Sequence, residues 1–218
     1  MVLRFSNVKT ESSPAPGSSA TQDSWTACLL VGGESRRMGT DKATLCIAGQ
    51  PLWRRQLNLL LALQPQNLWI SARSVPPWCP EGLEVVLDSP PSRGPLSGIS
   101  ACLQRLEAPH LIVVAIDMPQ MTLEHLSKLL ALVRPGRSLL PMNGNYFEPT
   151  CAIYSQSAVP FAAAALNEPD ASLQRFCKKL TIENVADSCL LRPEERPFYH
   201  NLNHPQDFDA LTDRQGGV

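Results

Sequence analysis

The chain has 218 residues, of which 44% are hydrophobic and 18% are charged, and its formal net charge is −1. This apolar content is enough for one buried core and excludes a chain that is disordered throughout. The balanced charge excludes an overall basic surface for nucleic acid, and no apolar run approaches the roughly 20 residues of a membrane span. We therefore expect neither a nucleic-acid partner nor a membrane partner.

The first residues differ from the rest in composition. Residues 6–24 are rich in serine, proline and threonine and nearly free of large apolar side chains. Such a segment cannot bury enough surface to offset the entropy of ordering it. We expect residues 1–24 to be a disordered leader and residues 25–218 to form a single domain.

Seven cysteines are scattered along the chain, without a C-x-x-C pair and without a histidine at zinc-ligand spacing. This pattern is typical of reduced, mostly buried thiols in a cytosolic protein. The N-terminus has charges but no continuous apolar segment, so it does not match a secretory signal. We expect a cytoplasmic location.

Strand and helix patterns alternate from residue 26 onward. Apolar runs predict buried strands at 26–31, 67–73, 83–88 and 110–117. Helical periodicity predicts helices at 52–64, 96–108 and 122–133, the last with Thr122 as its N-cap. The second half predicts strands at 138–142, 149–155 and 181–186 and helices at 158–166, 172–180 and 204–212. The alternation predicts a three-layer α/β fold, in which a Rossmann-like, mostly parallel sheet has helices on both faces.

Polar residues and glycines stand where the predicted strands end. Gly32 and Gly33 follow the first strand, while Ser71, Asp88 and Asp117 end the next three. Ligands of open parallel sheets bind outside the carboxyl ends of the strands. We expect these residues to lie along one edge of the sheet.

The loop after the first strand is rich in glycine and basic residues, and Leu29–Leu45 reads LLVGGESRRMGTDKATL. Its glycines let backbone N–H groups approach a ligand, and Arg36, Arg37 and Lys42 supply cationic donors that match phosphate oxygens. The spacing is neither that of a P-loop nor that of the G-x-G-x-x-G dinucleotide loop. The residues alone leave two alternatives open: a phosphate-binding loop, or a glycine turn followed by a solvated basic segment.

The same stretch resembles the signature of the MobA-like nucleotidyltransferases, L-A-G-G-x-S-x-R-M-G-x-D-K. Later segments agree with that family in order and spacing: RGPLSGI (93–99), VAIDMP (114–119), FEPTCAIYS (147–155) and NLNHPQD (201–207). The resemblance extends from about residue 26 to residue 212. Within the family it is greatest to the molybdenum cofactor guanylyltransferases.

This resemblance implies an enzyme of the nucleotidyltransferase fold that uses Mg²⁺ and releases pyrophosphate. In the guanylyltransferase branch, GMP passes from GTP to the phosphate of molybdenum-bound molybdopterin, which gives the guanine dinucleotide form of the cofactor. GTP and molybdopterin are therefore the implied partners. Molybdoenzymes or their chaperones are further candidates.

The resemblance also implies roles for individual residues. Arg37, Lys42 and Asp117 match catalytic positions: Arg37 would stabilise the departing pyrophosphate, Lys42 would neutralise the triphosphate, and Asp117 would bind the metal. Independently, a hard carboxylate at a strand end suits Mg²⁺ shared with phosphate oxygens. The expected nucleotide contacts are Leu30, Val31, Gly32, Gly33, Lys42, Ser71, Asp88 and Asp117. The expected substrate contacts are Gly94, Pro95, Asn201 and Asn203.

Two departures from the family pattern keep alternatives open. Val31 stands where alanine is usual, and Ser71 stands where asparagine is common, so CTP or a sugar-phosphate acceptor remains an alternative. A third alternative is a non-catalytic carrier of the cofactor. The strand-end aspartates Asp88 and Asp117 also suit simple turn caps, and Asn-x-Asn before proline also suits a plain turn.

Overall fold

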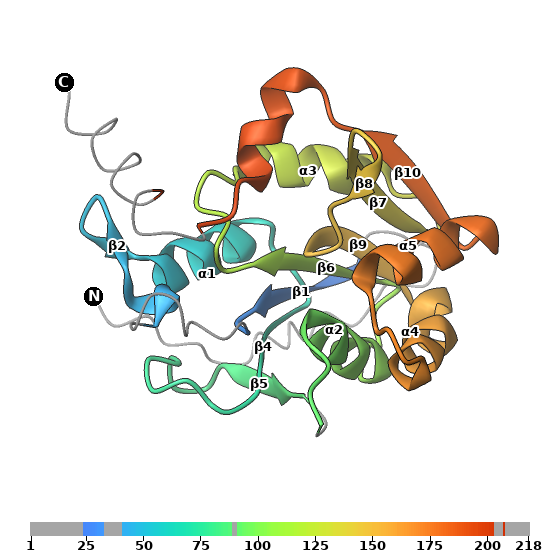
Figure 1. Ribbon diagram of the computed structural model, residues 1–218. Helices are drawn as coiled ribbons and strands as arrows, with labels where there is room; N and C mark the ends of the chain where they lie inside the picture. Colours follow the sequence, from blue (N-terminus) through green and yellow to red (C-terminus); the bar gives the residue numbers. More distant parts are fainter. Residues whose placement is uncertain (1–23, 33–40, 89–90, 203–206, 208–218) are drawn as a thin grey trace, which may run out of the picture.

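The computed structural model describes residues 24–32, 41–88, 91–202 and 207 (Figure 1). The predicted leader, apart from residue 24, lies outside these residues, as does the predicted helix at 204–212 apart from residue 207. The same holds for Gly33, Arg36, Arg37 and Asn203. No helix in the described ranges is long and apolar enough to cross a membrane.

A parallel block of strands forms one half of the main sheet. Strand β1 (Trp25–Leu30) lies between β6 (His110–Ala115) and β4 (Asn67–Ala72), and β5 (Glu84–Leu87) pairs with the far side of β4. All three pairings are parallel. The carboxyl ends of β1, β4, β5 and β6 therefore share one edge, as expected.

The other half of the sheet mixes directions. Strand β9 (Cys151–Ser155) runs antiparallel to both β6 and β7 (Ser138–Asn143). Beyond it, β10 (Ala186–Leu190) is parallel to β7, and the short β8 (Tyr146–Phe147) is antiparallel to β7. The order β10-β7-β9-β6-β1-β4-β5, with β8 on β7, confirms a mostly parallel sheet.

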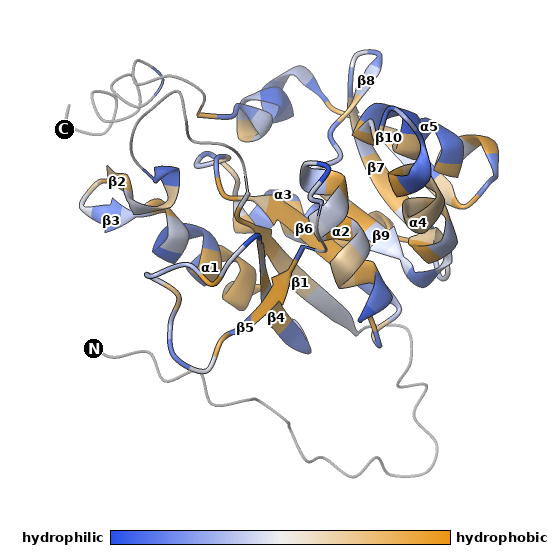
Figure 2. Ribbon diagram, turned by 60° about the horizontal axis from the view of Figure 1, so that its bottom comes forward, coloured by the Kyte–Doolittle hydropathy of each residue, from blue (hydrophilic) through white to orange (hydrophobic). Residues whose placement is uncertain are grey.

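Helices cover both faces of this sheet because its strands are apolar on both sides (Figure 2). One core contains Ala27 and Leu29 of β1 and receives α1 (Leu52–Ala62) and α3 (Leu123–Leu132). The opposite core contains Cys28 and Leu30. It receives α2 (Pro95–Gln104), α4 (Val159–Asn167) and α5 (Leu173–Ile182). The predicted three layers are therefore confirmed.

Short elements complete the fold. A two-stranded ribbon consists of β2 (Cys46–Ile47) and β3 (Gln50–Pro51). The described residues also form the 3₁₀ helices η2 (Lys42–Thr44), η3 (Gln156–Ala158) and η4 (Pro193–Tyr199). Helix α3 begins at the predicted cap, since the Thr122 hydroxyl accepts a hydrogen bond from the His125 N–H at 3.2 Å.

The predicted strand at 181–186 is wrong. Helix α5 continues to Ile182, and the strand begins only at Ala186. The β-branched pair at 181–182 favoured a strand, but the buried Phe176, Cys177 and Leu180 pack α5 into the core. The helical hydrogen bonds continue past the pair, since the Glu183 N–H donates to the Lys179 carbonyl at 3.0 Å. Asn184 then takes a positive φ of 58°, which ends the helix and turns the chain into β10.

Candidate active site

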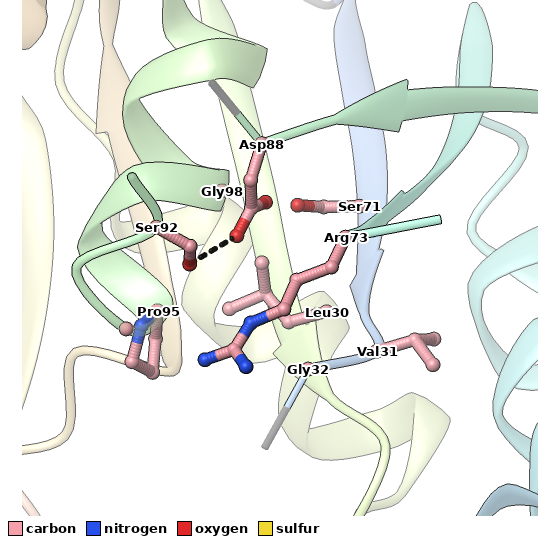
Figure 3. A pocket seen from close by; sticks show the side chains of 10 residues that line it. Leu30, Val31, Gly32, Ser71, Arg73, Asp88, Ser92, Pro95 and Gly98 are labelled. Carbon is pink, nitrogen blue, oxygen red and sulfur yellow. Dashed lines mark hydrogen bonds between the residues drawn. The ribbon is translucent and has the colours of Figure 1, made fainter. Parts of the chain in front are cut away.

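A pocket opens at the carboxyl ends of β1, β4 and β5, beneath the first turn of α2 (Figure 3). Its lining comes from strand ends and from the turn that precedes α2. The lining residues are Leu30, Val31, Gly32, Ser71, Arg73, Asp88, Ser92, Gly94, Pro95 and Gly98. Seven of the residues predicted as nucleotide or substrate contacts are therefore brought together here, namely Leu30, Val31, Gly32, Ser71, Asp88, Gly94 and Pro95.

Backbone hydrogen bonds fix the floor of this pocket. The Val31 N–H donates to the Ser71 carbonyl at 2.8 Å, which extends the pairing of β1 with β4 beyond the last residue of β1. On the other side, the Ile116 N–H donates to the Leu30 carbonyl at 3.1 Å. The end of β1 is thus held from both neighbouring strands, so the glycine loop starts from a rigid point.

Ser71 and Asp88 supply the inner polar atoms. Ser71 is buried near the end of β4, and the Asp88 N–H donates to the Ala72 carbonyl at 3.0 Å, which keeps Asp88 beside that strand. One carboxylate oxygen of Asp88 accepts a hydrogen bond from the Ser92 hydroxyl at 2.9 Å (Figure 3). The carboxylate is therefore held in place on the pocket wall.

Gly98 lets α2 approach these polar atoms closely. A Cβ added at this position would lie 2.3 Å from Ser71 Oγ and 3.2 Å from Asp88 Oδ1. The first contact is closer than real Cβ atoms come to any neighbour. Any side chain at 98 would therefore displace the Ser71 hydroxyl or move α2 away from the pocket.

Hydrogen bonds outside the pocket anchor the turn that precedes α2. Gly94 has a positive φ of 75°, and Pro95 occupies the first helical turn. The Arg93 guanidinium donates to the carbonyls of Leu166, Glu168 and Pro169, each at 2.6 Å. These bonds tie the turn to the end of α4.

Lys42 and Asp117 form a second polar centre on the other side of β1. Asp117 follows β6, and its Oδ2 lies 3.7 Å from the Lys42 ammonium. Lys42 also donates to the Leu202 carbonyl, and the Leu202 N–H donates to the Asp117 carbonyl at 2.8 Å. Residues from three distant parts of the chain thus meet at this point, and exposed Asn201 is next to it in sequence.

Helix α1 holds the turn that carries Asp117. The buried Gln56 donates to the Met118 carbonyl at 2.6 Å, and Arg55 donates to the Pro119 carbonyl at 3.1 Å. Sequence reasoning missed both residues. The available signal was a polar glutamine on the buried face of the predicted helix at 52–64.

The electrostatics of Asp117 are those of a desolvated carboxylate. Burial raises the pKa of Asp117 above its usual value, and the nearby Lys42 ammonium only partly offsets this. Among the described residues, no group of three or more His, Cys, Asp or Glu side chains is close enough to hold a metal ion. A hard cation at Asp117 would therefore take its other ligands from bound molecules such as water or a phosphate. Mg²⁺ fits such a site, because it is commonly bound by one or two carboxylates together with phosphate oxygens.

Comparison with known proteins agrees with this architecture. Residues 27–185 match the MobA-like NTP transferase domain family. The chain belongs to this family. It is 32% identical over 194 residues to a probable molybdenum cofactor guanylyltransferase of Opitutus terrae, a match that covers 88% of this chain and 96% of the relative. The resemblance seen in the sequence is thus confirmed, and the chain is a nucleotidyltransferase.

Solved structures show the same fold. Molybdopterin-guanine dinucleotide biosynthesis protein A of Archaeoglobus fulgidus superimposes on this nucleotidyltransferase with a TM-score of 0.68 at 22% identity, covering 88% of this chain and 100% of that chain. The 4-diphosphocytidyl-2C-methyl-D-erythritolsynthase of Anaerococcus prevotii gives a TM-score of 0.66 at 9% identity, covering 89% and 97%. The names of these two proteins refer to different bases, guanine in one and cytosine (as cytidyl) in the other, yet both proteins have this fold. The fold by itself therefore does not show which base is bound.

The close approach at Gly98 generates a stability prediction. Gly98→Ala should lower the melting temperature, because the new methyl group would overlap Ser71 Oγ; overpacking of this kind typically costs about 1–3 kcal/mol. The double variant Ser71→Ala with Gly98→Ala removes the overlapping oxygen and should recover most of the loss in a thermal melt. A double variant that melts as low as the single one would place the strain elsewhere.

The buried carboxylate generates a prediction about pH. The raised pKa of Asp117 means that ionisation of its carboxyl destabilises the folded state. This loss of stability is absent below pH 3.8, the ordinary carboxyl pKa, and grows as the pH rises to the raised pKa. Asp117→Asn cannot ionise and should therefore melt higher than the wild type at pH 7, with the gap closing toward pH 3. The exposed Asp170→Asn is the control, for which no such gain is expected. An equal gap at both pH values would contradict the assignment.

Proposed function

We propose that this nucleotidyltransferase transfers GMP from GTP to the phosphate of molybdenum-bound molybdopterin, forming the guanine dinucleotide cofactor and releasing pyrophosphate. The observation that carries the proposal is the pair of polar centres at the end of β1. The pocket with Ser71 and Asp88 lies on one side, and Lys42 with Asp117 lies on the other. The names of the Opitutus terrae and Archaeoglobus fulgidus relatives support guanine and molybdopterin as the chemistry.

The charges support one orientation of the nucleotide. Asp88 places a carboxylate on the pocket wall beside Ser71, whereas Arg73, the other charged lining residue, is exposed. A carboxylate repels phosphates, so the part of the pocket near Asp88 does not suit them. The base and ribose therefore suit the pocket. The triphosphate then passes over Gly32 toward the Lys42 ammonium, which neutralises phosphate charge.

Asp117 would hold Mg²⁺ in this arrangement, and the bound ion would supply neutralisation of charge on the transferring phosphate. The chain's own part is to present the carboxylate in a fixed position. Gln56 and the Leu202 backbone do this by holding the Asp117–Pro119 turn from two sides. Fixed charges of this kind stabilise a transition state without reorganising.

The reaction is an in-line displacement at the α-phosphorus of GTP. A terminal phosphate oxygen of the acceptor forms the new P–O bond, while the bond to the bridging oxygen breaks and pyrophosphate leaves with its electron pair. The acceptor is already anionic, so the reaction needs no general base. Lys42 acts on the triphosphate, and Arg37, which lies outside the described residues, is proposed to stabilise the leaving group.

The acceptor is proposed to approach from the side of the Leu202 segment. Asn201 is exposed and is held near Asp117 through the two hydrogen bonds of Leu202. Together with Asn203 it would bind the phosphate of the pterin through side-chain amide donors.

Pyrophosphate release measured with GTP, CTP and ATP in turn tests the function. With Mg²⁺ and molybdopterin present, we expect release with GTP alone. Release with CTP would favour the cytidylyl alternative that Val31 and Ser71 leave open. No release with any nucleotide would favour a non-catalytic carrier.

Variants of the second centre test the mechanism. Asp117→Ala should lower turnover on the order of 100-fold or more, as removal of a fixed transition-state charge does elsewhere. Lys42→Ala should mainly weaken GTP binding, on the order of tenfold to a hundredfold, because a charged hydrogen bond to phosphate is lost. The exposed Asp170→Ala and Lys178→Ala are matched controls. Near-normal transfer by Asp117→Ala would remove the metal assignment.

A further inference from the structure

Trp78 lies in the connection between β4 and β5, and no motif of the sequence pointed to it. Its indole N–H donates a hydrogen bond to Oδ2 of Asp41 at 2.9 Å. The other oxygen, Oδ1, accepts a hydrogen bond from the Ala43 N–H at 3.0 Å, so Asp41 caps η2, whose first residue is Lys42. One carboxylate therefore joins the turn that carries Lys42 to a loop 37 residues further along the chain.

We propose that Trp78 is a positioning residue for nucleotide binding: through Asp41 it holds the Lys42 ammonium where the triphosphate of GTP passes. This inference rests on the proposed function, since it assumes that Lys42 acts on that triphosphate. It assigns a role in the reaction to a side chain that acts only through another residue.

Helix α1 keeps the Trp78 indole in its orientation. The rings of Trp78 and Trp53 are stacked, with centroids 5.4 Å apart and an angle of 14° between their planes. The Arg54 guanidinium lies over the Trp53 ring, 5.0 Å from its centroid. Both kinds of contact are attractive beyond the apolar area that they bury. The indole is therefore held from one side by aromatic packing, and its N–H remains directed at Asp41.

Contacts at both ends hold η2 in place. After its last residue, the Leu45 carbonyl accepts a hydrogen bond from the Leu52 N–H at 2.9 Å, which ties that end to the first residue of α1. At the other end, Asp41 is bonded to Trp78. Asp41 directly precedes Lys42 in the sequence, so the contact with Trp78 is the one that restrains the backbone next to the ammonium-bearing residue.

The same helix also positions the second charge of this centre. Gln56 of α1 bonds the Met118 carbonyl and so holds the turn that carries Asp117, while Trp53 of α1 supports Lys42 by way of the neighbouring indole. The separation of 3.7 Å between the ammonium and the Asp117 carboxylate is thus set from one element. A charge that is already in position loses less affinity to ordering when a ligand binds.

Breaking the hydrogen bond from each of its two ends tests the proposal. Trp78→Phe keeps an aromatic ring against Trp53 but has no N–H. Asp41→Asn keeps an oxygen for the Ala43 N–H, because asparagine is also a good N-cap, and it turns an amide donor toward the indole. Calorimetric titration of the full chain with GTP and Mg²⁺, without acceptor, should show a loss of affinity on the order of fivefold in both variants, because a hydrogen bond to a charged group is lost.

Controls separate this effect from simple charge and from a general loss of structure. Removing the negative charge of Asp41 would by itself strengthen the binding of a triphosphate, so the loss expected for Asp41→Asn has the opposite sign. Trp53→Phe alters the same stack but leaves the indole N–H and Asp41 in place, and it should bind GTP nearly as the wild type does. Both test variants should lose less affinity for GMP, which lacks the β- and γ-phosphates, than for GTP.

A Lys42→Ala background completes the test, since Trp78→Phe should cause no further loss of GTP affinity once the ammonium is gone. An equal loss in both backgrounds, equal losses for GTP and GMP, or tighter GTP binding by Asp41→Asn would overturn the role of Trp78 and leave the guanylyl transfer standing. A wild type that does not bind GTP with Mg²⁺ would contradict the proposed function itself. Asp41→Asn keeps the cap of η2, so it decides the matter even where Trp78→Phe impairs folding.

Discussion

Two backbone hydrogen bonds at the end of β1 are the constraint on which the rest of the site depends. They join Val31 to the Ser71 carbonyl and Ile116 to the Leu30 carbonyl. Because β4 and β6 are both parallel to β1, these bonds also fix where the chain leaves β4 and β6 at the same edge of the sheet. The pocket with Ser71 and Asp88 and the Lys42–Asp117 centre are thereby placed on either side of one strand, as the proposed transfer along an extended nucleotide requires.

A helix packs against each of the two centres. At the pocket, α2 crosses Ser71 and Asp88 so closely that a side chain at position 98 would displace the Ser71 hydroxyl. At the second centre, burial opposes ionisation of Asp117, and α1 holds the turn with Gln56 and Arg55. The desolvation of Asp117 is thus offset by hydrogen bonds and packing around it.

Much of this arrangement could be predicted from the sequence. Apolar strands alternating with helices imply a parallel block, and that block alone brings Gly32, Ser71 and Asp88 to one edge. What could not be predicted depends on tertiary contacts. The strand expected at 181–186 failed because the packing of α5 against the core overrode β-branched propensity. Arg73 and Gln56 belong to no motif, so only the folded chain shows what they face.

The most direct test of the central claim is amide hydrogen exchange with a non-hydrolysable GTP analogue and Mg²⁺. A nucleotide that spans β1 should slow exchange on both sides at once, at residues 71–73 and 92–98 and at residues 42–44 and 117–118. Protection limited to one side, or found only outside these segments, would contradict the placement of base and triphosphate on opposite sides of β1.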